Sequence, residues 1–352
     1  MFNKEVQINN ISIGPKQTPY IVAEMSGNHN QSIDRALKLI EEAAKTGVQA
    51  IKIQTYTPET MTLDINKAEF CIKNEFEQWS EKNLFQLYKE AHTPWEWHKD
   101  IFEFAKEKGI TCFSSPFDSS AVELLESLNA PAYKIASFEL TDLPLIKLCA
   151  ETMKPIIIST GMGTLNEIYD AVETVEKTGN KNLVLLKCTS SYPAPHSQAN
   201  LATIKHMSET FNCLTGLSDH TLGLGTSIAA IALGAVFIEK HFTLRRADGG
   251  VDSSFSLEPE EFTELVAAAK QAHSSVGSIS YGCQTEAAQN SRKFRRSLYF
   301  VKDVKKGETI QSEHIRAIRP GYGLKPKYLD KIIGKTLKQD VTRGTATTWE
   351  LI

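Results

Sequence analysis

The chain has 352 residues, of which 41% are hydrophobic and 23% are charged, and its formal net charge is −3. This composition is typical of a globular protein, and the small negative charge argues against nucleic-acid binding, which usually needs a basic face. Residues 1–7 lack the apolar core of a signal peptide, and no run approaches the roughly 18 apolar residues of a membrane span. We therefore expect a cytoplasmic protein with no nucleic-acid or membrane partner.

Buried strand-like segments alternate with helix-like segments through most of the chain. The predicted strands are residues 19–24, 50–54, 110–114, 132–137, 155–160, 183–189, 213–218 and 235–241. The predicted helices are residues 33–45, 94–108, 119–128, 143–151, 164–178, 200–210, 221–233 and 258–275. Sequential alternation implies parallel strands and right-handed crossovers, so we expect a TIM (β/α)8 barrel, with a doubly wound open sheet as the alternative.

The connection between the second and third strands, residues 55–93, is much longer than the others and contains a helix-like piece at 83–91. Loops of this length are uncommon unless they are functional, so we expect it to form a lid. We expect Trp95 and Trp97 to be ordinary packing residues, because they fall at a helix start. The aromatic residues that could line the lid are Tyr56, Trp79, Trp95 and Trp97.

The texture of the sequence changes after the last predicted helix. We predict a barrel domain at residues 1–280, a polar linker at 281–292 and a compact domain at 293–352, rich in short strands and turns. A domain of that size cannot bury a large core, so we expect it to lean on the barrel or on a partner subunit. The six cysteines lie far apart with no C-x-x-C pair, which indicates reduced thiols.

Polar side chains gather where the predicted strands end. In a barrel these positions all open at one mouth, which is where barrel enzymes carry their active sites. Lysines and hydroxyls beside Gly161 form an anion-binding composition, so we expect a substrate that carries phosphate or several carboxylates. These strand-end residues are Glu24, Lys52, Gln54, Ser114, Ser115, Lys134, Ser137, Ser159, Thr160, Lys187, Thr189, Ser190, Ser218, Asp219, His220, Glu239, Lys240 and His241.

His220 and His241 end two neighbouring strands, and adjacent strands lie about 4.8 Å apart. Two imidazoles at that spacing can bind one divalent cation, with Glu24 or Asp252 supplying oxygen nearby. Water and substrate would complete the shell, which suits Mn²⁺ or another labile metal better than a closed zinc site. The alternative is a pair of hydrogen-bonded histidines that orient a substrate without metal.

Two other functions fit parts of the pattern. Lys187 ends a predicted strand where a barrel lysine can form a Schiff base with a keto acid, as in class I aldolases. The C-terminal domain could also belong to a carbohydrate- or ice-binding protein, although the anion-binding residues of the barrel argue against that. A metal-dependent amidohydrolase is weaker still, because the first strand lacks H-x-H.

Motifs along nearly the whole chain resemble the sialic acid synthase family, and they occur in family order. The segment at residues 25–31 and three others, at 54–58, 93–98 and 113–118, are similar to the pseudaminic acid synthase branch of that family. The family motifs are Ala23-Glu-Met-Ser-Gly-Asn-His-Asn30, Lys52-Ile-Gln54, Tyr133-Lys-Ile-Ala-Ser137, Ser159-Thr-Gly161, Cys188-Thr, Tyr192-Pro, Gly216-Leu-Ser-Asp-His220, Glu239-Lys-His-Phe-Thr243 and Arg319-Pro-Gly321.

The resemblance implies a phosphoenolpyruvate-using barrel followed by a small antifreeze-like (SAF) domain. The cofactor would be a divalent metal, Mn²⁺ with Mg²⁺ or Co²⁺ as alternatives, on His220 and His241. It would polarise the aldehyde of an open-chain diacetamido-trideoxy hexose for attack by C3 of phosphoenolpyruvate, with loss of phosphate by C–O cleavage. N-acetylneuraminate and legionaminic acid synthases are the alternatives within the family.

The resemblance also implies roles for individual residues. Glu24, His220 and His241 would be catalytic. Glu24, Tyr192 and Asp252 would contact the sugar. Arg319 of the partner subunit would reach the sugar, which implies a domain-swapped homodimer. Ser190 stands where relatives commonly carry asparagine. The residues implied to bind phosphoenolpyruvate are Lys52, Gln54, Ser114, Lys134, Ser137, Ser159, Ser190 and Ser218.

Overall fold

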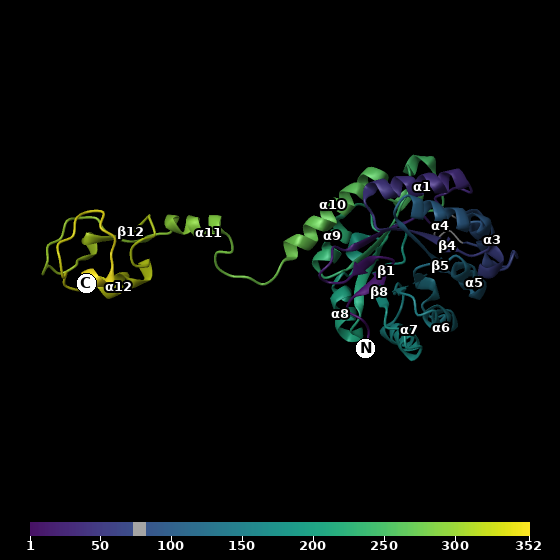
Figure 1. Cartoon of the computed structure of the whole chain (residues 1–352), viewed down its shortest axis with the longest axis horizontal. Coiled ribbons are helices and arrows are strands. Elements are labelled where there is room, and N and C mark those ends of the chain that lie inside the picture. Colours follow the sequence, from purple (N-terminus) through teal and green to yellow (C-terminus); the bar gives the residue numbers. More distant parts are fainter. Residues whose placement is uncertain (73–81) are drawn as a thin grey trace. The chain divides into compact units, whose positions relative to one another are not determined.

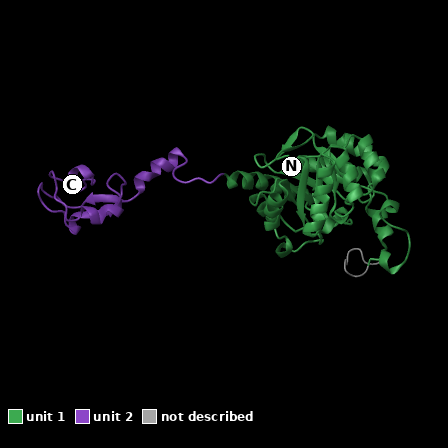
Figure 2. Cartoon of the chain, turned by 90° about the horizontal axis from the view of Figure 1, so that it is seen from below, with its two compact units in different colours: residues 1–277 green, residues 278–352 purple. Residues whose placement is uncertain are grey.

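The structure is a computed structural model that describes residues 1–72 and 82–352. Trp79, one of the aromatic residues expected at the lid, lies outside the described residues. The chain forms two compact units, Met1–Gly277 and Ser278–Ile352 (Figure 2). Within the described ranges, no helix is long and apolar enough to cross a membrane.

The first unit is a closed barrel of parallel strands ringed by helices (Figure 1). Strand β10 pairs with β3 and closes the barrel, with His241 opposite Glu24. The predicted TIM barrel is confirmed, and the open-sheet alternative is wrong. The barrel strands are β3 (Tyr20–Glu24), β4 (Ala50–Thr55), β5 (Thr111–Pro116), β6 (Tyr133–Ile135), β7 (Ile156–Ser159), β8 (Leu183–Cys188), β9 (Leu214–Asp219) and β10 (Phe237–His241).

Helices follow the strands as the apolar periodicity predicts. In α1, the Ser32 side chain caps the N-terminus by accepting from Arg35 N, and Gly47 ends the helix with a φ of 85°. The long connection after β4 contains two short helices, α2 (Pro58–Met61) and α3 (Leu84–Ala91). The surrounding helices are α1 (Ile33–Thr46), α4 (His98–Glu107), α5 (Ser119–Ser127), α6 (Leu143–Glu151), α7 (Leu165–Lys177), α8 (Ala202–Phe211), α9 (Gly225–Ala232) and α10 (Pro259–Val276).

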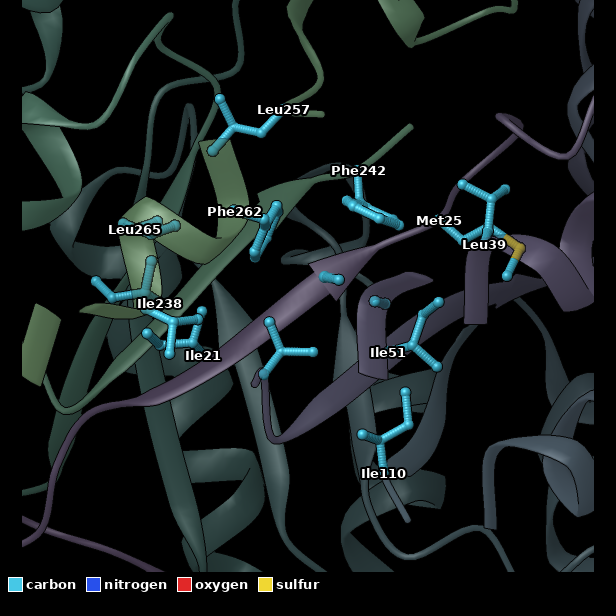
Figure 3. Close-up of a cluster of buried hydrophobic side chains, with 14 of the residues drawn as sticks. Ile21, Met25, Leu39, Ile51, Ile110, Ile238, Phe242, Leu257, Phe262 and Leu265 are labelled. Carbon is cyan, nitrogen blue, oxygen red and sulfur yellow. The ribbon is translucent and has the colours of Figure 1, made fainter. Parts of the chain in front are cut away.

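Alternate strand residues point outward and pack against the helices. Figure 3 shows Ile21 of β3 and Ile238 of β10 in one such cluster, with Phe262 and Leu265 of α10 beside them. All four side chains are at most 2% exposed, so this layer fixes each strand against its helix. The inward residues are therefore free to build the barrel interior.

The lower interior of the barrel is apolar. A hairpin of β1 (Val6–Ile8) and β2 (Ile11–Ile13) contributes Ile8 and Ile13 to the same buried cluster as Phe113 and Phe237. Position 216 in this layer requires glycine, because a Cβ there would come within 2.2 Å of the Phe237 carbonyl oxygen. The packed lower layer leaves only the upper layer open for substrates.

The second unit is small and has its own apolar cluster, which includes Leu298, Phe300 and Ile332. Two antiparallel strands, β11 (Ser297–Phe300) and β12 (Ile315–Ile318), form its sheet. The helices of this unit are α11 (Glu286–Asn290) and α12 (Leu329–Ile332).

Candidate active site

Buried charges fill the upper interior of the barrel, at the carboxyl ends of its strands. Lys52 Nζ lies 2.7 Å from Glu24 Oε2 and 4.0 Å from Glu239 Oε2. Lys134 Nζ lies 3.6 Å from Glu239 Oε1, which also accepts a hydrogen bond from Ser218 Oγ at 3.1 Å. Each of these five side chains comes from a different strand, so closure of the barrel assembles the cluster.

The two carboxylates of this cluster differ in acidity. Burial raises the pKa of Glu24, and the neighbouring Lys52 offsets only part of that effect. For Glu239 burial acts in the same direction, but the charges of Lys134 and Lys52 outweigh it and lower the pKa. Glu239 is therefore the ionised partner of both lysines, and Glu24 is the carboxyl that accepts a proton more readily.

Hydroxyl groups form a second part of the mouth, beside Lys134. Gly161 N donates to Ser137 Oγ at 3.1 Å, and a Cβ on Gly161 would come within 2.3 Å of Ser190 Oγ. Ser159 Oγ is buried without a hydrogen-bond partner. A buried hydroxyl without a partner is costly, so it fits a site completed by an anionic group of a ligand.

Ser114 lies outside this group, although the resemblance assigns it to phosphoenolpyruvate. Its Oγ is 2.6 Å from Thr55 Oγ1 and donates to the Ile53 carbonyl at 3.1 Å, on the helix-facing side of β5. The next residue, Ser115, faces the interior and accepts from Lys52 Nζ at 3.2 Å. Because side chains alternate along a strand, a shift of one residue exchanges the two faces.

The rings of His220 and His241 lie side by side, with centroids 5.3 Å apart. His220 Nδ1 is 3.0 Å from the Thr189 carbonyl, so this nitrogen donates, and in the neutral ring Nε2 carries the lone pair. His241 Nδ1 is buried without a hydrogen-bond partner and lies 4.0 Å from Asp252 Oδ2. Burial holds the pKa of His241 well below its ordinary value, so its imidazole is neutral.

These features fit a divalent cation, because both rings offer lone pairs and a carboxylate lies near. In the described part of the chain, no group of three or more His, Cys, Asp or Glu side chains is arranged to hold a metal ion. Any cation here would therefore keep open positions for water and substrate, as a labile catalytic metal does.

A cavity of about 590 Å³ opens at this end of the barrel. Its lining includes Gln54, Tyr192, His241 and Asp252, four of the residues expected at the site, together with residues of α3. Gln54 Nε2 donates to Glu24 Oε1 at 3.0 Å, and the Tyr192 ring centroid lies 4.4 Å from that of His220. The cavity thus joins the charged cluster to the histidine pair.

The described part of the long connection after β4 contributes to this cavity. Tyr56 lines it, packed edge-on against Tyr88 and Phe117 at centroid distances of 5.7 and 5.2 Å. Trp97 packs instead against His29, with ring centroids 5.6 Å apart. The described part of the connection is therefore a wall of the site.

Glu139 was not predicted at the site, and Glu239 was predicted at the mouth of the barrel but given no role there. Glu139 lines the cavity, its Oε2 is buried without a hydrogen-bond partner, and burial raises its pKa to about 7. It follows a short strand within a 3-10 turn, where no periodic pattern marks it. Glu239 could have been found, because it is two residues before His241 and so shares its face of β10.

Lys187 is not in the barrel interior. Lys187 Nζ donates to the Cys188 carbonyl at 2.6 Å and to Thr189 Oγ1 at 3.3 Å. It alternates with Leu186 and Cys188, which point inward, so it cannot meet a substrate held by Lys52 and Lys134. Arg319 belongs to the second unit, where it is exposed.

Comparison with known proteins defines the class. Residues 39–281 match the model of the NeuB family, and residues 295–352 match the SAF domain. The chain belongs to the NeuB family. The expected SAF domain is therefore confirmed, and the protein is a phosphoenolpyruvate-dependent enzyme of the transferase type.

Individual relatives refine the comparison. The chain is 44% identical to the pseudaminic acid synthase of Campylobacter jejuni subsp. jejuni serotype O:2, over 97% of this chain and 98% of that one. It is 36% identical to the N,N'-diacetyllegionaminic acid synthase of the same organism, over 91% and 97%. Among solved structures, the N-acetylneuraminic acid synthetase of Leptospira borgpetersenii in complex with citrate is similar, with a TM-score of 0.73 and 29% identity over 82% of this chain and 95% of that one.

Proposed function

We propose that the protein condenses phosphoenolpyruvate with 2,4-diacetamido-2,4,6-trideoxy-L-altrose and water, giving pseudaminic acid and phosphate. The observation that carries this proposal is the mouth of the barrel, where two buried lysines and a group of serines adjoin a histidine pair. The higher identity to a pseudaminic acid synthase than to a legionaminic acid synthase of one organism supports the choice of sugar.

The lysines and serines would hold phosphoenolpyruvate. Lys52 and Lys134 would neutralise its charge, and the hydroxyls of Ser137, Ser159 and Ser190 would face the phosphate. Ser218 donates to Glu239 and Gln54 donates to Glu24, so both lie beside the charged cluster. C3 of phosphoenolpyruvate then forms a bond to the sugar aldehyde carbon, water adds at C2, and the C2–O bond breaks to release phosphate.

The sugar would enter from the cavity beside the histidines. Asp252, Tyr192 and Glu139 line that cavity and can accept or share hydrogen bonds with its hydroxyl and amide groups. Glu24, whose pKa burial raises and which contacts Lys52 and Gln54, would hold and move a proton at the sugar.

His220 and His241 would hold a divalent cation, Mn²⁺ or alternatively Mg²⁺ or Co²⁺. When bound, such a cation supplies Lewis acidity at an aldehyde oxygen. The protein's own contribution is to keep His220 in one tautomer through Thr189 and to keep His241 neutral through burial.

A domain-swapped homodimer in the cytoplasm would complete the site with Arg319 of the partner subunit. Mixing two inactive variants tests this. Arg319→Ala and His241→Ala, refolded together, should regain roughly a quarter of wild-type activity, because half of the dimers contain one intact site. No recovery on mixing would show that Arg319 does not act across subunits.

The proposed reaction is tested by phosphate release. The protein is incubated with phosphoenolpyruvate, Mn²⁺ and one of three sugars, namely the diacetamido-trideoxy altrose, the legionaminic acid precursor or N-acetylmannosamine. We expect the altrose derivative to give the highest kcat/KM. Preference for N-acetylmannosamine would overturn the proposal.

A further inference from the structure

Helix α3 forms one wall of the cavity, and its apolar side chains are only half-buried. Leu84, Leu87, Tyr88 and Ala91 all line the cavity, and yet α3 has no buried residue. A helix of 8 residues is too short to be stable by itself, and no residue of α3 is fully buried. Contacts at its ends therefore decide where it lies.

Gln31, in the loop between β3 and α1, contacts the C-terminal end of α3. Its side-chain amide donates to the carbonyl of Glu90 at 2.9 Å and to the carbonyl of His92 at 2.7 Å. The last carbonyls of a helix lack partners within the helix, so an amide donor here fixes this end. The same loop packs closely against α3, because a Cβ on Gly27 would lie 3.2 Å from Ala91 Cα.

The backbone conformation of Gln31 also indicates that its side chain has a role. Its φ of 54° lies in the left-handed region, which favours glycine. Glycine would relieve the strain at this position, whereas a glutamine adds two hydrogen bonds to α3. The effects of strain and of side-chain contacts can therefore be separated by substitution.

We propose that Gln31 is a positioning residue for sugar selectivity, because it holds α3 so that the apolar wall meets the C6 end of the sugar. This inference rests on the proposed function, which supplies a sugar without a hydroxyl at C6. The aldehyde end belongs beside His241 and Asp252, in the polar part of the same cavity. Leu84 and Leu87 then favour a methyl group and leave a C6 hydroxyl without hydrogen bonds.

Three substitutions at one position test the proposal in the full-length protein. Gln31→Glu keeps the size and the strain but removes the donors, Gln31→Gly removes both side chain and strain, and Gln31→Lys keeps a donor. We expect the KM for the diacetamido sugar to rise roughly three- to tenfold in the first two variants and to stay near wild type in the third. The KM for phosphoenolpyruvate and kcat should change less than about twofold.

Hydrogen exchange of the backbone amides in residues 84–92, measured without substrate, gives a readout that does not depend on the sugar. We expect faster exchange in Gln31→Glu and Gln31→Gly. The matched control is Asn129→Gly, which relieves a φ of 56° in the exposed turn after α5. If Gln31→Glu keeps both the wild-type sugar KM and wild-type exchange, the proposal is wrong.

The two hypotheses fail in different ways. If the wild-type protein turns over only another amino sugar, the proposed function fails, and the positioning role is then measured with that sugar and by exchange. If the wild type uses the altrose derivative but the Gln31 variants match Asn129→Gly, only the positioning role fails.

Discussion

The two layers of the barrel interior come from the same strands and differ completely in chemistry. In the lower layer Ala50 and Phe237 belong to an apolar cluster, whereas two residues further along their strands Lys52 and Glu239 form an ion-pair network. The lower layer is closed by the N-terminal hairpin, while the upper layer keeps Ser159 Oγ and His241 Nδ1 buried without hydrogen-bond partners. Stability therefore comes from the lower layer, and the upper layer is built for a ligand.

Substitution of the histidines in the upper layer should abolish activity without loss of stability, which is the largest effect that we predict. We expect His220→Ala and His241→Ala each to lower kcat by at least about 1000-fold, because each removes a ligand of the proposed cation. Their melting temperatures should stay close to wild type. His206→Ala, on the exposed face of α8, is the matched control. More than a tenth of wild-type activity in either variant would contradict the assignment.

A cavity in the lower layer should have the opposite effect. Phe113 is 0% exposed within the apolar cluster, so Phe113→Ala should lower the free energy of unfolding by about 3–5 kcal/mol. The KM values of the folded variant for both substrates should match wild type. Urea denaturation and steady-state kinetics at a permissive temperature measure both, and a loss below about 1 kcal/mol would show that the layer is not the stabilising one.

Acid should weaken the upper end of the barrel. Burial lowers the pKa of His29 and of His98 to about 4, whereas an unfolded chain has the ordinary value of 6.5. Between those values the unfolded state binds more protons, so stability is complete above about pH 6.5 and falls as the pH drops towards 4. We expect a loss of about 2 kcal/mol per histidine at pH 5.

Urea denaturation at pH 7 and pH 5 measures this loss. In His98→Asn, the difference between the free energies of unfolding at pH 7 and pH 5 should be smaller by the contribution of one histidine. An unchanged difference would mean that His98 does not carry the acid sensitivity.

The smallest predicted effects distinguish two adjacent serines. Ser115→Ala removes a partner of Lys52 and should lower kcat/KM for phosphoenolpyruvate by about tenfold. Ser114→Ala should instead cost about 1 kcal/mol of stability, because its hydroxyl bonds Thr55 and the Ile53 carbonyl. Steady-state kinetics with varied phosphoenolpyruvate and urea denaturation measure the two effects. If the family-based assignment of Ser114 is right, Ser114→Ala and not Ser115→Ala will lower kcat/KM for phosphoenolpyruvate.

Much of the fold was predictable, because it follows from local pattern. Apolar runs placed all the barrel strands, and polar residues at their ends indicated the mouth that Glu24, Lys52 and His241 share. The placement of Ser114 outside the interior is a matter of register, since a one-residue difference decides which side of β5 a hydroxyl faces.

Other parts of the site depend on contacts between distant segments and leave no local signal. Glu139 enters the cavity from a turn, and the position of α3 depends on Gln31, which is 59 residues before Glu90 in sequence. Neither alternation nor helical periodicity reports such contacts.

The most direct test of the synthase assignment follows the bridging oxygen of phosphoenolpyruvate. Phosphoenolpyruvate labelled with ¹⁸O between C2 and phosphorus is incubated with the protein, Mn²⁺ and the diacetamido-trideoxy altrose, and the released phosphate is analysed by mass spectrometry. Breakage of the C2–O bond predicts that the phosphate carries the label and appears only with the sugar. Unlabelled phosphate, or labelled phosphate released without sugar, would contradict the account.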